Sequence, residues 1–211
     1  MLNIGVLVSG GGTNLQALID NINCGFLGGC RISVVISSRK NAYALERASN
    51  AGIPSFCIIR KDYNEPEDYD KAIISKMEEH DVELVVMAGF LSILGKLFIS
   101  AYAGRVINIH PSLIPSFCGK GFYGIIPHQK AIEYGVKLTG ATVHFVELDT
   151  DAGPIILQKA IEVLDEDTPE SLQQRVMSEC EQQILPMAVR LFAEGKLVIE
   201  GRRVRTIRSM S

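Results

Sequence analysis

The sequence predicts an α/β domain whose sheet is mostly parallel and becomes antiparallel toward the C-terminus. Short runs rich in β-branched residues alternate with segments whose apolar residues recur every three or four positions, which is the pattern of successive βαβ units. Residues 84–88 form an unbroken apolar run, typical of a central parallel strand that is buried on both faces. Near the C-terminus, two apolar runs flank the short turn "LDTDAG", which indicates an antiparallel pair.

Strands and amphipathic helices alternate through the N-terminal half. The first strand ends in three glycines, and Thr13 then opens a helix with one apolar face. Pro66 and the acidic residues after it suit the first turn of another helix, and Gly52 suits the end of one. We therefore expect strands at residues 2–8, 31–38, 54–60, 82–90 and 106–109, and helices at residues 13–22, 41–52, 66–81 and 91–104.

The C-terminal half begins with a long loop. Residues 111–124 are rich in glycine, proline, serine and aromatic residues, and unstructured loops of this length are uncommon in compact domains unless they are functional. Further on, Thr168 is a good N-cap with Pro169 at the first helical position, and Pro186 is a candidate position for a kink. The expected elements are a helix at residues 127–135, strands at 138–147 and 154–163, a helix at 168–195, and a hairpin over 196–207.

Composition and charge are those of an ordinary globular domain. The chain has 211 residues, of which 47% are hydrophobic and 21% charged, and its net charge of −3 predicts no general attraction to nucleic acid or anionic lipid. No apolar stretch approaches the ~20 residues of a membrane-spanning helix, and the N-terminus lacks the features of a secretory signal. Five cysteines without metal or redox spacing indicate a reduced, cytoplasmic compartment.

The segment "SGGGTN" joins the first strand to the first helix. Its glycines allow successive backbone N–H groups to face a ligand, and Thr13 and Asn14 add side-chain donors where the helix dipole is positive. This chemistry suits one phosphate group. The segment is no Walker loop, and Leu15 stands where a dinucleotide-binding loop has its third glycine. A tight turn without a ligand is an equally good interpretation of these residues taken alone.

An amide and an imidazole lie two residues apart at the end of the strand expected at residues 106–109. Side chains alternate along a strand, so Asn108 and His110 point to the same face, and Pro111 ends the ladder. Ligands of open α/β sheets bind at this carboxyl edge. Together the two side chains could stabilise an oxyanion, His110 as an imidazolium. A buried structural histidine and a turn asparagine are the alternative.

A carboxylate could complete this group. Asp151 follows the strand that holds His144, and a carboxylate beside an imidazole keeps it charged or passes protons through water. Asp149 is the competing acid, with a role in the turn as its alternative, and His144 either orients the carboxylate or is a core histidine. No base is apparent beside any serine or cysteine, so we interpret Cys118 as an inert thiol and expect direct acyl transfer to a nucleophile of the substrate.

Three segments resemble the folate-dependent formyltransferases: "NIHPSLIPSF", "GATVHFV" and the "DAGPIILQ" that follows it. The N-terminal "VSGGGTNLQALID" narrows the resemblance to the branch that formylates glycinamide ribonucleotide in purine synthesis. The likeness covers nearly the whole chain, from Ile4 to about Phe192. It implies a doubly wound, Rossmann-like sheet in one domain of residues 1–211, with a nucleotide- and phosphate-binding half at 1–105 and a catalytic, folate-binding half at 106–211.

The resemblance also implies the reaction. The co-substrate is 10-formyltetrahydrofolate, and its formyl group passes to the amine of glycinamide ribonucleotide through a tetrahedral oxyanion, with no metal. The partners are these small molecules, and we expect a monomer or a homodimer that binds neither nucleic acid nor membrane.

Site residues are carried over from the resemblance position by position. Asn108, His110 and Asp151 match the catalytic trio, with His144 behind them, and Glu181 matches the acid that holds the acceptor amine, with Glu179 as the alternative. The phosphate-binding matches are Gly12, Thr13 and Asn14. The folate-binding matches are Phe90, Leu91, Ser92, Leu94, Val146, Leu148, Asp149 and Thr150.

The sequence departs from the family pattern in three places. Ser92 and Pro66 stand where many members have arginines near the folate glutamate tail, and Arg60 or Lys61 could substitute there. The loop at residues 116–127 is longer than usual, and His128 matches its last histidine. The helix near "MSECEQQ" is one residue longer.

Three other functions compete. A formyltetrahydrofolate hydrolase would use water in place of the amine, but that family usually has a regulatory domain before the catalytic one. A methionyl-tRNA formyltransferase shares the trio but continues into a tRNA-binding domain, whereas this chain ends at Ser211 and is acidic. A phosphate-sensing module without activity would bind ligands and turn nothing over, and the intact trio argues against it.

Overall fold

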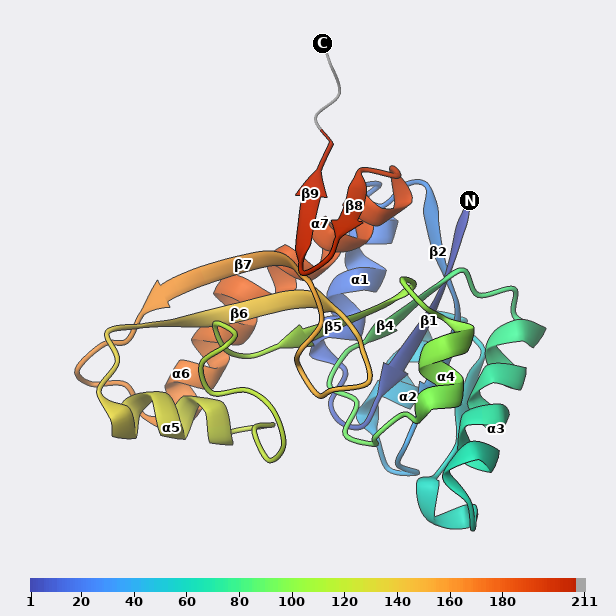
Figure 1. The fold of residues 1–211 in the computed structure, drawn as a ribbon, viewed down its shortest axis with the longest axis horizontal. Coiled ribbons are helices and arrows are strands. Elements are labelled where there is room, and N and C mark those ends of the chain that lie inside the picture. Colours follow the sequence, from blue (N-terminus) through green and yellow to red (C-terminus); the bar gives the residue numbers. More distant parts are fainter. Residues whose placement is uncertain (208–211) are drawn as a thin grey trace. The chain divides into compact units, whose positions relative to one another are not determined.

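The computed structural model describes residues 1–207 and divides into two compact units, Met1–Asn108 and a second that begins at Ile109 (Figure 1). The boundary falls inside strand β5 (Val106–His110). The predicted division of one domain into halves at residues 1–105 and 106–211 stays a prediction. Among the described residues, no helix combines the length and the apolar character that crossing a membrane requires.

The first unit is a parallel α/β sheet. Its strands lie in the order β3-β2-β1-β4-β5, and each neighbouring pair is parallel. The remaining strands are β1 (Leu2–Val8), β2 (Cys30–Ser37), β3 (Ser55–Cys57) and β4 (Leu84–Met87). The helices are α1 (Thr13–Asn23), α2 (Tyr43–Asn50), α3 (Pro66–Glu79) and α4 (Lys96–Ala101), and α3 and α4 pack side by side (Figure 1).

The centre of this unit is strand β1. Ile4, Val6, Leu7 and Val8 are fully buried, which matches the unbroken apolar run in the sequence. Burying one such side chain contributes roughly 1.5–3 kcal/mol. The strand therefore fixes the position of the glycine loop that follows it.

The second unit contains the antiparallel portion. Strands β6 (Leu138–Phe145) and β7 (Ile155–Glu162) pair antiparallel, and β8 (Leu197–Glu200) and β9 (Arg203–Thr206) form the expected hairpin around Gly201. The helices are α5 (Ile126–Tyr134), α6 (Pro169–Val176) and α7 (Gln182–Ala193). The predicted fold class, a mostly parallel α/β sheet with an antiparallel C-terminal portion, is confirmed.

The helix expected at residues 91–104 is wrong in its extent, because α4 is only Lys96–Ala101. Its start is set by Asp70, a buried residue of α3. Gly95 N donates to Asp70 Oδ1 at 2.9 Å and Phe98 N donates to Asp70 Oδ2 at 3.1 Å. The first amides of a helix need acceptors from outside it, and here the acceptor is 25 residues upstream of Gly95.

The strand expected at residues 54–60 is also shorter. Strand β3 covers Ser55–Cys57, and a short 3₁₀ turn follows at Arg60–Asp62. The last residue of β3 pairs with Ser37, which is the last residue of β2. An edge strand ends where its single partner ends, whatever the β-propensity of the residues that follow.

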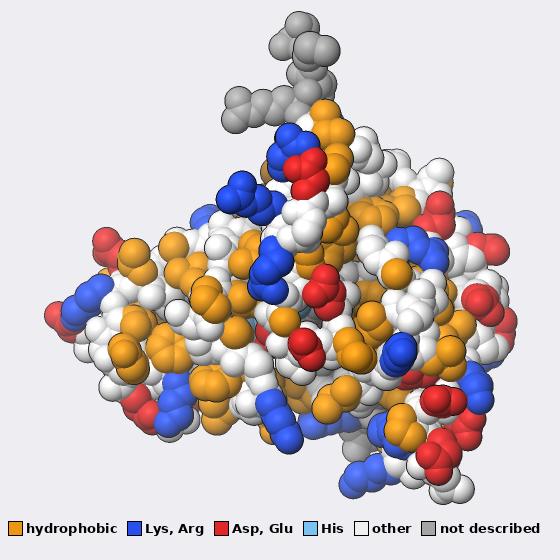
Figure 2. Space-filling model, viewed as in Figure 1, with side chains coloured by type: hydrophobic (Ala, Val, Ile, Leu, Met, Phe, Trp, Pro, Cys, Tyr) orange, Lys and Arg blue, Asp and Glu red, His pale blue; other side chains and the backbone are white. Residues whose placement is uncertain are grey.

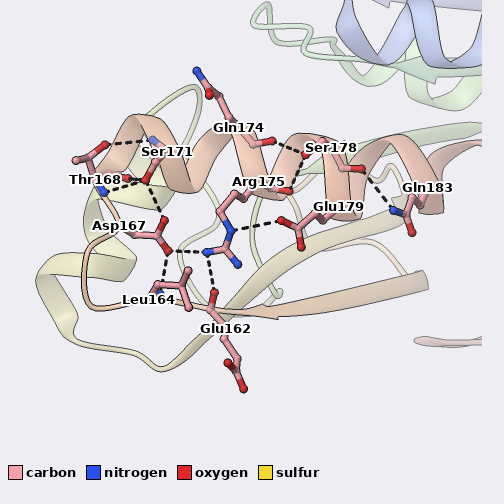
Figure 3. Close-up of polar contacts among 10 residues, drawn as sticks. All are labelled: Glu162, Leu164, Asp167, Thr168, Ser171, Gln174, Arg175, Ser178, Glu179 and Gln183. Atoms are coloured by element: carbon pink, nitrogen blue, oxygen red, sulfur yellow. Dashed lines mark hydrogen bonds and ion pairs between the residues drawn. The ribbon is translucent and has the colours of Figure 1, made fainter.

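The single helix expected at residues 168–195 is interrupted by a π turn at Met177–Glu181. The departure from α geometry therefore precedes Pro186, which lies inside α7. Cys180 and Glu181 are both buried, although neighbours on a regular α-helix point about 100° apart. A π turn contains one residue more than an α turn, so it changes the directions of neighbouring side chains and allows Cys180 and Glu181 both to be buried. Ser178 O accepts a hydrogen bond from Gln183 Nε2 at 3.5 Å (Figure 3).

The N-terminus of α6 is capped as the sequence predicts. Thr168 Oγ1 accepts from Ser171 N at 3.2 Å, and Ser171 Oγ accepts from Thr168 N at 2.9 Å, which makes a capping box. Asp167 accepts from Ser171 Oγ at 2.9 Å and from Arg175 Nη1 at 2.7 Å (Figure 3). These contacts join the first two turns of α6 to the loop before it.

Charged side chains of both signs are interspersed on the face seen in Figure 2. Basic side chains gather around the C-terminal hairpin, where Arg205 pairs with Glu200 across the two strands. A mixed surface of this kind creates no large field of one sign.

The cap of α4 by Asp70 yields a stability prediction. Asp70→Ala leaves the amides of Gly95 and Phe98 without their acceptor, so the free energy of unfolding should fall by roughly 1–3 kcal/mol in urea titrations. Asp68→Ala is the matched control, because Asp68 lies exposed on the same helix and pairs only with Lys71 among the described residues; its effect should stay within about 0.5 kcal/mol. Equal effects of the two variants would contradict the cap.

Candidate functional site

The predicted amide and imidazole lie at the end of β5. Asn108 and His110 are two residues apart on one strand and so share a face, while Ile107 and Ile109 are buried on the other. His110 is only 4% exposed. The strand ends at His110, and the irregular loop expected at residues 111–124 follows it.

A backbone carbonyl fixes the orientation of the His110 ring. Nε2 of His110 lies 3.1 Å from the carbonyl oxygen of Phe117. A carbonyl oxygen only accepts, so Nε2 carries a hydrogen and donates to it. Nδ1 therefore faces the other way, where it lies 3.4 Å from Oδ2 of Asp151. The Phe117 carbonyl of the loop thus determines which ring nitrogen of His110 faces the carboxylate.

Three groups lie around the Asp151 carboxylate. Gly119 N donates to Oδ2 at 2.8 Å, His110 Nδ1 faces the same oxygen, and His144 Nε2 lies 3.6 Å from Oδ1. His144 is buried, and its Nδ1 donates to the carbonyl oxygen of Phe145 at 2.8 Å. The backbone of Asp151 is left-handed with φ 54°, a conformation that aspartate tolerates better than most residues.

Burial and these contacts set the charges of the pair. Burial alone would raise the pKa of Asp151, but the neighbouring His144, the charge of His110 and the Gly119 amide outweigh it, so the pKa lies below its ordinary value. Burial lowers the pKa of His110, and the Asp151 carboxylate and Phe117 carbonyl only partly oppose that shift. At neutral pH the carboxylate is ionised and the neutral imidazole is favoured. The prediction of an imidazolium therefore does not apply to this resting state.

Two side chains of the sheet anchor the loop that supplies these contacts. Thr142 of β6 is fully buried; its Oγ1 donates to Ser112 O at 2.7 Å and accepts from Ile114 N at 3.1 Å. Gln158 of β7 donates from Nε2 to Ile114 O at 3.0 Å and to Thr142 Oγ1 at 3.0 Å. The start of the loop is thereby fixed to strands β6 and β7, which restricts where Phe117 and the residues after it can lie.

The surroundings of Cys118 disfavour its thiolate form. Its Sγ donates to Pro115 O at 3.3 Å, and burial together with the charge of Asp151 raises its pKa. A thiol with a raised pKa is a poor nucleophile at neutral pH.

The glycine loop of the first unit lies between β1 and α1. Gly12 is left-handed with φ 72° and serves as N-cap of α1, whose first residue is Thr13. Asn14 is 5% exposed. The helix N-terminus, its dipole and the glycine backbone thus coincide as predicted, and a phosphate-binding role for these residues stays a prediction.

The predicted folate-binding residues fall in two segments. In the first unit they follow β4, where Phe90 and Leu94 are buried and Leu91 is 42% exposed. Ser9, at the end of β1, holds this segment: its Oγ accepts from Leu91 N at 2.8 Å and lies 2.6 Å from the hydroxyl of Ser38. Ser92 lies within the same segment.

In the second unit the predicted folate-binding residues belong to the turn after β6. Val146 is partly buried, and Leu148, Asp149 and Thr150 are exposed. The carbonyl oxygen of Asp149 accepts from Ala152 N at 3.3 Å within this turn. Their contacts with a folate stay a prediction.

The two candidate acids for the acceptor amine differ in environment. Glu181 ends the π turn and is 4% exposed. Glu179 is exposed, and its Oε1 accepts from Arg175 Nε at 3.3 Å (Figure 3). Which of the two contacts the acceptor amine stays a prediction.

Two contributors to the site could not be named from the sequence, the Phe117 carbonyl and the Gly119 amide. Both are backbone groups, and the only hint of them was the richness of the loop in glycine.

His128 is a further buried residue near the start of α5: it is fully buried, and neither ring nitrogen has a partner among the described residues. Within the same residues, no group of three or more His, Cys, Asp or Glu side chains could hold a metal ion.

Comparisons with known proteins agree on one family. A sequence model described as "Formyl transferase" matches residues 2–189. The phosphoribosylglycinamide formyltransferase of Escherichia coli (strain K12) is 39% identical over 196 residues, which cover 93% of this chain and 89% of that protein. The trifunctional purine biosynthetic protein adenosine-3 of Chironomus tentans is 41% identical over 193 residues, but this chain spans only 14% of its length.

Solved structures agree as well. The crystal structure of glycinamide ribonucleotide transformylase 1 from Symbiobacterium toebii superposes with a TM-score of 0.93 at 45% sequence identity. The match covers 99% of this chain and 95% of that one. Agreement over almost the full length of both chains means that the fold is shared as a whole.

Thr142 provides a test of the loop anchor. Thr142→Val keeps the shape of the side chain but leaves Ile114 N–H and Ser112 C=O without their partner, so the free energy of unfolding should fall by about 1–3 kcal/mol. Thr139→Val is the control: it makes the same chemical change at a buried position of the same strand, outside these contacts. Urea denaturation measures both, and no difference between them would show that the anchor contributes nothing.

His128 predicts an acid-sensitive stability. Burial, with a smaller effect from the charge of His110, lowers its pKa to about 4, so the folded state favours the neutral ring. The stability from a depressed pKa is complete above the unfolded value of about 6.5 and is lost as the pH falls toward 4; the loss should reach about 3 kcal/mol. His128→Leu removes the titrating ring and should flatten the decline between pH 6.5 and 4 in thermal or urea unfolding. Identical acid slopes in both proteins would contradict this account.

Proposed function

This chain belongs to the formyl transferase family, and from that membership we infer that it acts as a phosphoribosylglycinamide formyltransferase. It transfers a formyl group from a formyl folate, which we propose to be 10-formyltetrahydrofolate, to the amine of glycinamide ribonucleotide in purine biosynthesis. The observation that supports this activity most directly is the buried His110–Asp151 pair at the end of β5, with 3.4 Å between Nδ1 and Oδ2.

The proposed reaction is a direct transfer. The neutral amine of the acceptor attacks the formyl carbon, a C–N bond forms, and the carbonyl oxygen becomes an oxyanion. Collapse of this intermediate breaks the bond to the folate nitrogen, which leaves with a proton. Asn108 donates a hydrogen bond to the oxyanion. His110 takes up a proton from water at Nδ1 as the oxyanion forms, stabilises it as an imidazolium, and returns that proton to water when the intermediate collapses.

The resting charges are consistent with these roles. His110 is neutral at rest, and its Nδ1 faces an ionised carboxylate, so the imidazolium that forms during the reaction gains a neighbouring negative charge. Asp151 moves the amine proton through water toward the departing nitrogen. His144 and the Gly119 amide keep the carboxylate in position. The low pKa of Asp151 keeps it able to accept hydrogen bonds throughout the neutral range.

The binding roles follow the family match. We propose that Gly12, Thr13 and Asn14 bind the acceptor phosphate and that Glu181 binds its amine. We propose that the folate contacts come from Phe90, Leu91, Ser92, Leu94, Val146, Leu148, Asp149 and Thr150. Arg60 is less available for the glutamate tail than its charge suggests, because Nη1 donates to Tyr63 O at 2.6 Å.

The cellular setting is proposed on simpler grounds. All five cysteines are free thiols, which supports a reducing, cytoplasmic compartment. The assembly is a monomer or a homodimer, and the substrates are small molecules.

Activity is tested by mixing the purified protein with glycinamide ribonucleotide and 10-formyltetrahydrofolate and following the release of tetrahydrofolate. Release should require the nucleotide, and formylated nucleotide should accumulate in equal amount. Release at the same rate without the nucleotide would identify a hydrolase instead. Binding of both ligands without any release would identify a binding module.

The catalytic pair is tested by substitution. Asn108→Ala removes the oxyanion donor and His110→Ala removes the neighbouring imidazolium, so in each variant kcat should fall by about 10²–10³ while the nucleotide still binds. Steady-state kinetics measure the fall, and thermal unfolding checks that both variants fold. Near-normal turnover in either variant would contradict the role of the residue replaced.

A further inference from the structure

The glycine loop of the first unit is bonded along its carbonyl side by helix α2. Ala44 N, in the first turn of α2, donates to Gly10 O at 3.1 Å. Arg47, one turn further on, donates from Nε to Gly11 O at 2.8 Å. Two successive carbonyls of the loop therefore point at the same helix.

The direction of each carbonyl also sets the direction of the amide that follows it, because the peptide bond is planar. In a trans peptide the C=O and the following N–H point in opposite directions. A Gly10 carbonyl turned toward α2 directs the N–H of Gly11 to the opposite side of the loop, and the Gly11 carbonyl does the same for the N–H of Gly12. Adjacent N–H groups that face one side form an anion-binding nest.

Contact between the loop and α2 is close. A Cβ on Gly12 would lie 2.7 Å from Ala44 Cβ and 2.8 Å from Ala44 Cα, and Gly12 already has a positive φ of 72°. No side chain larger than the hydrogen atom of glycine fits between position 12 and Ala44. The helix therefore serves as a rigid backing for the loop, and Arg47 is the side chain that reaches from it to the loop backbone.

The Arg47 side chain is itself fixed at two further points. Its guanidinium carbon lies 5.0 Å from the centre of the Tyr43 ring, and Nη1 donates to Gln16 Oε1 at 3.0 Å. Gln16 belongs to α1, and its backbone N donates to Gly12 O at 2.9 Å. Arg47 thus links α2, the loop and the first turn of α1, which are the parts that carry the proposed phosphate ligands.

We propose that Arg47 is a positioning residue for the phosphate subsite: its Nε–H holds the Gly11 carbonyl so that the amide of Gly12 faces the phosphate. This role rests on the proposed function, because it concerns the acceptor of that reaction. The contribution is a directed hydrogen bond to the loop backbone, and the positive charge of the guanidinium is not required for it.

A matched pair of substitutions separates the hydrogen bond from the charge. Gln places Nε2 where Arg has Nε and keeps a neutral donor, whereas Met has similar length and no donor. Arg47→Met should raise the KM for glycinamide ribonucleotide and the Kd for inorganic phosphate by roughly tenfold. Arg47→Gln should stay within about threefold of the wild type, and the KM for the formyl folate should change little in both. An equal loss in the two variants would overturn the proposal, because charge would then be the cause.

The acceptor without its phosphate, glycinamide riboside, gives an internal control. Arg47→Met should leave kcat/KM for the riboside unchanged, since that substrate does not use the subsite; an equal loss for both acceptors would also overturn the proposal. Arg105→Met is the control for a general structural effect. Arg105 lies 4.9 Å from the Tyr102 ring centre and donates to Ala101 O at 2.7 Å, yet it is in neither α2 nor the loop.

A wild-type measurement covers the case in which Arg47→Met does not fold. Titration with inorganic phosphate should shift the amide resonances of Gly11 and Gly12 with one common Kd. Absence of these shifts would overturn the proposal without any variant. Phosphate binding is measured apart from turnover, so a protein that binds phosphate as described but releases no tetrahydrofolate would refute the proposed function and leave the role of Arg47 standing.

Discussion

An ionised carboxylate can be buried only if other groups compensate for the water it loses, and Asp151 imposes this constraint on the second unit. Its oxygens meet a backbone amide and two imidazole rings, which come from the loop after β5, from β5 itself and from β6. Each of the two rings also contacts a backbone carbonyl, Phe117 O for His110 and Phe145 O for His144. The loop is therefore part of the proposed site, because its backbone supplies contacts that orient both members of the pair.

The same principle recurs at three other buried polar side chains. Asp70 sets the first turn of α4, Thr142 fixes the start of the loop, and Ser9 holds the segment after β4. In each case one side chain satisfies backbone groups that belong to a distant part of the chain. An unsatisfied buried backbone group costs about 1–3 kcal/mol, so these few residues fix the positions of a helix start, of a loop and of the segment after β4.

Periodicity predicted much of the site and none of its fine geometry. The period of two in a strand placed Asn108 and His110 on one face, and the turn after β6 brought Asp151 into consideration. Asp149 and Asp151 could not be separated by those residues alone, and it was the family resemblance that favoured Asp151. The structure distinguishes them physically: Asp151 is left-handed and its side chain faces the histidines, whereas the Asp149 carbonyl closes the turn. The charge of His110 was also beyond the sequence, because burial depends on what packs around the ring.

The sequence by itself determined the order and type of most elements, the glycine loop at a helix N-terminus, and the residue types that carry the chemistry. These follow from local properties: hydrophobic period, β-branching, capping residues and turn residues. Only the tertiary structure decided where α4 and β3 begin or end, why a π turn interrupts the long helix, and which backbone groups hold His110 and Asp151. The reason is that each of those outcomes depends on a hydrogen-bond partner or a packing neighbour from a distant part of the chain, and such a partner leaves no local pattern in the sequence.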